Sequence, residues 1–92
     1  MEFLVRFEAT PPADMTSDER DRLKGLERQR AGELRASGIL KKLWRVPGRR
    51  GVVGLWEAED ASALHDALAS LPMFPWMDAV VEPLATHPQE RS

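Results

Sequence analysis

Apolar and charged residues alternate near the start of the chain, in the segment EFLVRFE at positions 2–8. Phe3, Val5 and Phe7 fall on one side of an extended backbone, because successive side chains of a strand point to opposite faces. Pro11 and Pro12 follow and end the pattern, since proline disrupts a strand. The segment is therefore predicted to be a half-buried strand.

A helix is predicted over residues 17–37, between two terminal signals. Thr16 followed by Glu19 is a capping-box pattern, in which each residue satisfies a backbone amide of the first turn. Gly38 is a typical stop residue just beyond the last turn. The separation of these signals predicts a helix of about six turns.

The apolar stripe of this helix contains two charged residues. At about 100° per residue, Leu26 and Leu34 lie on the same side as Leu23. Glu27 and Arg30 lie on that side as well. In one interpretation they lie at the edge of the stripe, reach water or form an ion pair with each other. In the other, Glu27 points into a cavity, where burial raises its pKa towards that of a general base and Arg30 lowers it.

The rest of the chain predicts a hairpin, a shorter helix and a final strand. The expected ranges are strands at 39–46 and 51–58 around Pro47-Gly48, a helix at 61–71 capped by Asp60, and a strand at 77–84. This order predicts an α+β, ferredoxin-like βαββαβ fold with a four-stranded antiparallel sheet and two helices on one face. Residues 1–92 are interpreted as a single domain, with 88–92 as a flexible or subunit-docking tail.

Composition narrows the possible partners. A chain of 92 residues with 42% hydrophobic and 30% charged residues is expected to fold, and covering the open sheet face by a second copy would stabilise so small a domain. The net charge of -2 argues against nucleic acid. Two histidines and no cysteine argue against a metal site and a disulfide framework. No apolar run is long enough to span a membrane, and the expected location is the cytoplasm.

The predicted hairpin carries a cluster of basic residues in the segment KKLWRVPGRRG, positions 41–51. Lysines and arginines on an edge strand commonly protect it from aggregation, which accounts for Lys41 and Lys42. Arg45 differs because it stands between Trp44 and Val46, and a guanidinium beside an aromatic ring suits a small carboxylate. The expected ligand is therefore a small organic anion.

The segment SLPMFPWMD, positions 70–78, combines two prolines with several large apolar side chains. Pro72 and Pro75 predict a rigid connection from the second helix to the last strand. Phe74 and Trp76 are predicted either to line a cavity or to contact another subunit. Met73 is assigned to a subunit contact.

Three motifs together resemble the muconolactone Δ-isomerase family. These are KLWRVPG at 42–48, ALHDALASLPMFPWMD at 63–78 and His87-Pro88, and the resemblance covers nearly the whole chain. It implies a ferredoxin-like subunit whose dimers assemble into a decamer. It also implies a cofactor-free shift of a double bond in a small anionic lactone, giving the enol-lactone of 3-oxoadipate in aromatic-compound catabolism.

The resemblance also implies roles for individual residues. Glu27 matches an acidic position of the family and would carry the proton, while Arg45 matches the arginine of the LWR motif and would anchor the carboxylate. Apart from the resemblance, the positions of Trp44, Arg30, Arg49, Phe74 and Trp76 in the chain add these five residues to the expected substrate-binding set. Arg49, Arg50 and Trp76 depart from the family pattern, so a non-catalytic small-anion-binding protein on the same scaffold is the alternative.

Overall fold

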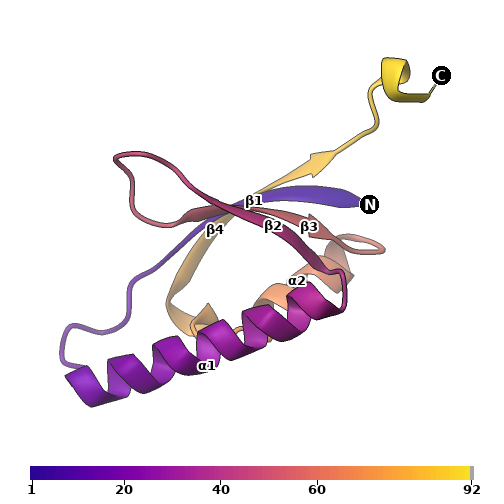
Figure 1. The fold of residues 1–92 in the computed structure, drawn as a ribbon. Helices are drawn as coiled ribbons and strands as arrows, with labels where there is room; N and C mark the ends of the chain where they lie inside the picture. Colours follow the sequence, from indigo (N-terminus) through magenta and orange to yellow (C-terminus); the bar gives the residue numbers. More distant parts are fainter. Residues whose placement is uncertain (92) are drawn as a thin grey trace.

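The computed structural model describes residues 1–91 and has the predicted order of elements (Figure 1). They are β1 (Glu2–Ala9), α1 (Ser17–Ala36), β2 (Leu40–Arg45), β3 (Val52–Glu57), α2 (Ala61–Ala69) and β4 (Met77–Leu84), with short 3-10 helices η1 (Phe74–Trp76) and η2 (Pro88–Arg91). Every predicted boundary lies within two residues of the observed one. The last residue of the predicted tail, Ser92, lies outside the described residues.

The four strands form one antiparallel sheet in the order β2-β3-β1-β4. Figure 1 shows both helices on the same side of this sheet, which confirms the predicted α+β arrangement. The other face of the sheet is bare. No helix within residues 1–91 combines the length and apolar character that a membrane crossing requires.

Local signals start both helices where the sequence predicts. The hydroxyl of Thr16 accepts a hydrogen bond from the Glu19 amide at 3.1 Å, and the Glu19 carboxylate accepts one from the Thr16 amide at 3.4 Å. The Asp60 carboxylate likewise accepts the Ala63 amide at 2.8 Å. Each cap satisfies amides that the first turn would otherwise leave unpaired.

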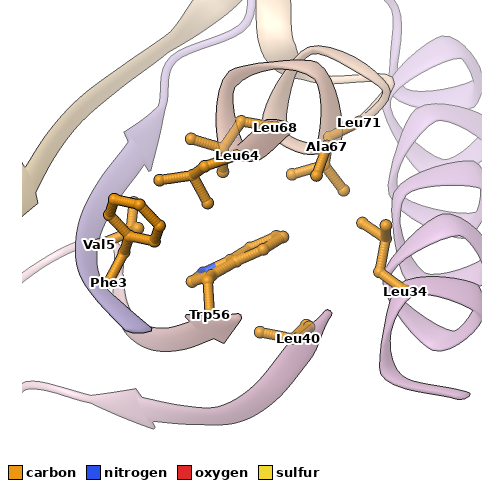
Figure 2. Close-up of a cluster of buried hydrophobic side chains, with 9 residues drawn as sticks. All are labelled: Phe3, Val5, Leu34, Leu40, Trp56, Leu64, Ala67, Leu68 and Leu71. Carbon is orange, nitrogen blue, oxygen red and sulfur yellow. The ribbon is translucent and has the colours of Figure 1, made fainter. Parts of the chain in front are cut away.

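The hydrophobic core lies between the sheet and the helices, around the fully buried Trp56 (Figure 2). Phe3 and Val5 reach it from β1, and Leu34 reaches it from the C-terminal half of α1. Leu64 and Leu68 close it from α2. The alternation seen in the sequence of β1 thus places its odd-numbered apolar residues under the helices.

The two helices differ in length, and the longer one, α1, packs on the core mainly through its C-terminal half. The 20 residues of α1 extend for about 30 Å, whereas α2 has only nine residues. Of the leucines predicted on the apolar stripe of α1, Leu34 is buried, but Leu26 is 43% exposed. Leu26 lies about 60° around the helix from Leu23, which places it at the edge of the stripe. The N-terminal half of α1 therefore has fewer core contacts.

A β-bulge in β2 decides which side chains of this strand face the helices. Leu40 pairs with Trp56 but Lys42 pairs with Leu55, so Lys41 is an extra residue in the ladder. An extra residue reverses the faces of all side chains that follow it. As a result Arg45, opposite Val52, lies on the same face as Leu40 although their numbers differ in parity.

Candidate active site

An open cavity of about 610 Å³ lies between the N-terminal half of α1 and one end of the sheet. Its walls combine the end of β1, the turn end of the β2–β3 hairpin, the connection after β1 and the segment at the start of β4. Figure 1 shows where these elements lie in the fold. The residues that line it are Phe7, Glu8, Ala9, Thr10, Pro11, Ala13, Arg20, Leu23, Lys24, Glu27, Arg45, Arg50, Gly51, Val52, Met73 and Met77. Its volume is typical of small-molecule sites, which span about 300–1,000 Å³.

Glu27 is held in the wall of this cavity by a contact between segments far apart in the sequence. The backbone amide of Met73 donates a hydrogen bond to Oε1 of Glu27 at 2.9 Å. Met73 precedes η1, in the segment fixed by Pro72 and Pro75. Within residues 1–91, Oε2 of Glu27 has no hydrogen-bond partner, so this oxygen is available to a ligand.

The surroundings of Glu27 favour its protonated form. Burial raises the pKa of the Glu27 carboxyl above its usual value of 4.5, because a buried charge loses solvation, and the Met73 amide partly offsets this by stabilising the carboxylate. Desolvation is the larger of the two effects. A carboxyl with a raised pKa is a stronger base when ionised, which suits a group that accepts and returns a proton near neutral pH.

Arg30 lies on the same helix but has other partners. Its Nε donates to the hydroxyl of Ser70 at 2.9 Å, and its Nη1 forms an ion pair with Glu33 at 3.3 Å. The sequence suggested that Arg30 would either pair with Glu27 or lower its pKa. In the structure the Met73 amide has this second effect, and Arg30 instead ties α1 to the end of α2.

Arg45, at the end of β2, lines the same cavity as Glu27 of α1. Arg50, Lys24 and Arg20 also line it, although none of them belongs to the site predicted from the sequence. Helical spacing could have found two of them, because residues 20, 24 and 27 fall on one face of a helix. Arg20 donates to the carbonyl oxygens of residues 12 and 13 at 3.2 and 3.4 Å, and so holds the connection between β1 and α1.

Trp44 and Arg49 are not among the cavity-lining residues. Trp44 pairs with Val53, so it lies on the open face of the sheet, where it is 41% exposed and the Lys42 ammonium lies 5.6 Å from its ring centre. Arg49 lines a smaller depression of about 220 Å³ together with Arg6 and Asp78. Strand alternation explains why Trp44 and Arg45, although adjacent, do not share a site.

The segment at 70–78 contributes methionines to the cavity, and not its aromatic residues Phe74 and Trp76. Met73 and Met77 line it. Phe74 instead makes an edge-to-face contact with His65, with ring centres 5.7 Å apart, and packs against the core. The carbonyl of Trp76 accepts the Thr10 amide at 3.0 Å, which joins the segment to the connection after β1.

Comparisons with known proteins agree over nearly the full chain. The family model described as muconolactone delta-isomerase matches residues 1–90. Muconolactone Delta-isomerase 2 of Acinetobacter lwoffii is 36% identical over 87 residues, covering 95% of this chain and 91% of the relative. Muconolactone Delta-isomerase of Pseudomonas aeruginosa is 36% identical over 88 residues, covering 96% and 92%.

A solved structure of muconolactone isomerase superposes on this fold with a TM-score of 0.87 at 35% identity, covering 96% of this chain and 92% of that one. The family model, the relatives and the superposition thus agree with the order of elements and with the sequence motifs. The chain belongs to the muconolactone Δ-isomerase family.

Proposed function

We propose that this protein is a cofactor-free isomerase that moves the C=C double bond of muconolactone or a similar small carboxylated lactone. The observation that carries the proposal is the shared cavity, where a partly buried carboxyl with a raised pKa and an unpaired guanidinium line the same space. Membership of the family supports the reaction class.

In the proposed reaction Glu27 is the proton carrier. Its free Oε2 removes a proton from the carbon made acidic by the conjugated lactone carbonyl, which leaves a dienolate and a protonated Glu27. The same carboxyl then returns the proton to another carbon of the dienolate, so that the double bond moves and the enzyme is unchanged. Because burial raises the pKa of Glu27, its carboxylate is a stronger base than an ordinary glutamate, which favours removal of the proton from the lactone.

The cations have a complementary role in this proposal. Arg45 binds the carboxylate of the lactone, which orients the ring towards Glu27. Lys24 extends from α1 into the same cavity and stabilises the negative charge that develops on the lactone oxygen. Arg30, Trp44, Arg49, Phe74 and Trp76 are left out of this mechanism, because they do not line the cavity.

The experiment is to incubate the purified protein with muconolactone and follow formation of the enol-lactone. Glu27→Gln should lower kcat by at least ~10²-fold, the lower range for a positioned acid-base group. Glu33→Gln is the matched control, because Glu33 is on the same helix but outside the cavity. Turnover no faster than in buffer would favour the alternative, a non-catalytic protein that binds small anions. Wild-type turnover by Glu27→Gln would remove Glu27 from the mechanism.

A further inference from the structure

The cavity and the whole chain carry charges of opposite sign. Four cationic side chains and two carboxylates line the cavity, which gives it a formal charge of +2 when both carboxylates are ionised. The whole chain has a net charge of -2. The six groups are Arg20, Lys24, Arg45, Arg50, Glu8 and Glu27. Gathering cations in a hollow that also has apolar walls raises the local concentration of anions.

Most of these cations are unpaired. Arg20 is engaged with backbone carbonyls. Lys24, Arg45 and Arg50 have no hydrogen bond or ion pair with any group in residues 1–91. A ligand with a single carboxylate can satisfy one guanidinium, but a ligand with two can satisfy both arginines and neutralise the formal charge of the cavity.

Arg50 has a defined place in the wall. It directly precedes Gly51, whose positive φ of 84° lets the hairpin approach the carbonyl of Phe7. Together with the pairing of Phe7 and Val52, this close approach places the backbone at residue 50 beside the end of β1, where Phe7 and Glu8 also line the cavity. Arg50 borders the smaller depression too, so it lies where the two hollows adjoin, whereas Arg49 borders only the smaller one.

We propose that the preferred ligand is a dianion: a small lactone with two carboxylates, one bound by Arg45 and the second by Arg50. The choice of a lactone rests on the proposed function. The preference for two negative groups rests on the unpaired cations. Arg50 is thus a specificity-determining residue, which selects among carboxylated lactones without taking part in the proton transfer.

Binding of two inert probes tests this inference. The first is a saturated γ-lactone with one acetate arm, and the second is the same lactone with an additional ring carboxylate. Saturation removes the double bond, so isothermal titration calorimetry at pH 7.5 and low salt reports binding alone. The wild type should bind the dianion at least ~10-fold more tightly, the effect of one added charge-assisted hydrogen bond.

Variants locate the second binding position. Arg50→Gln should abolish the difference between the probes and leave the affinity for the monoanion within about two-fold. Arg49→Gln, the matched control at the neighbouring position, should keep the difference. Arg45→Gln should weaken binding of both probes. The inference is overturned if the wild type binds both probes equally, or if Arg49→Gln acts like Arg50→Gln, since the preference would then be a general effect of charge.

The two proposals can fail separately. If the wild type isomerises muconolactone but binds both probes equally well, the proposed function is supported and the preference for a dianion is rejected. If the wild type prefers the dianion probe but isomerises neither muconolactone nor its unsaturated dicarboxylate analogue, the isomerase function is rejected and the preference for a dianion is supported.

Discussion

At the scale of single residues, the proposed proton transfer depends on the two carboxylate oxygens of Glu27. One accepts the Met73 amide at 2.9 Å, and the other is free within the described part of the chain. This arrangement fixes the orientation of the carboxyl while leaving one oxygen for a proton. Burial raises the pKa of Glu27, and the amide offsets part of that rise.

The raised pKa of Glu27 has a consequence for stability. Folding raises this pKa above 4.5, so the folded state binds the proton more tightly than the unfolded state does. The resulting stabilisation of the folded state is complete below about pH 4.5, and it is lost as pH rises through the folded pKa. A glutamine side chain does not titrate, so Glu27→Gln does not lose this stabilisation as pH rises. The free energy of unfolding of the variant relative to wild type should therefore increase from pH 4 to pH 8, as measured by urea denaturation at both pH values. A relative stability that instead falls with pH would contradict the pKa direction.

The Met73 amide should set the acid limb of the pH-rate profile. Replacing the amide between Pro72 and Met73 by an ester, through chemical synthesis of the chain, removes the N–H while keeping the side chain. The hydrogen bond favours the carboxylate, so its loss should raise the pKa of Glu27 and move the acid limb of kcat/KM to higher pH. Met73→Leu keeps the N–H and should leave the limb in place. An unmoved limb in the ester would show that this amide does not tune the base.

At the scale of elements, two features of the β2–β3 hairpin place cations in the cavity. The bulge at Lys41 turns Arg45 to the helix side of the sheet. Gly51 then lets the start of β3 approach β1 closely, which positions Arg50. Neither feature changes the predicted strands, but together they decide which arginines face Glu27.

Two glycines of this hairpin offer a matched test of packing. Both have positive φ, 77° at Gly48 and 84° at Gly51. A methyl group at Gly48 would meet open space, whereas one at Gly51 would lie 2.5 Å from the Phe7 carbonyl oxygen. Gly48→Ala should therefore cost about 1–2 kcal/mol for backbone strain alone. Gly51→Ala should cost clearly more free energy of unfolding and, by displacing Arg50, reduce the preference for the dianion probe over the monoanion probe. Equal losses of stability would mean that the close approach is unimportant.

At the scale of the whole molecule, the helices cover one face of the sheet and leave the other bare. The bare face carries apolar side chains, including Trp44, Leu84 and Val80, of which Val80 is 61% exposed. We propose that a second copy covers this face, as expected from the sequence, because an exposed apolar sheet face commonly marks a subunit contact.

Val80→Glu tests this self-association. The wild type should elute as an oligomer in size-exclusion chromatography with light scattering, and the variant should form a smaller species because a charge would be buried in the contact. Ala36→Glu adds the same charge at the end of α1 and should not change the assembly. A monomeric wild type, or equal assembly of both variants and wild type, would exclude the open face as a contact.

The order of elements, their approximate ends and the family could all be read from the sequence, because they follow from local patterns. The alternation in β1, the capping box at Thr16 and the motif around Arg45 each involve residues close together in the chain. The sequence also predicted that Glu27 and Arg45 share one cavity, and both residues line it; their roles in a reaction stay a prediction.

The tertiary structure decided which neighbours these residues have. Glu27 accepts a hydrogen bond from the Met73 amide 46 positions away, and Arg30 donates one to Ser70 40 positions away. Arg45 lies on the cavity side of the sheet only because of the bulge in β2. The predicted substrate-binding set included Trp44, Phe74 and Trp76, with a subunit contact as the alternative for the last two. None of the three lines the cavity, whereas Met73, Met77 and Arg50 do. Local patterns specify a backbone conformation and a face, whereas the partner across that face depends on strand register and on the packing of segments distant in sequence.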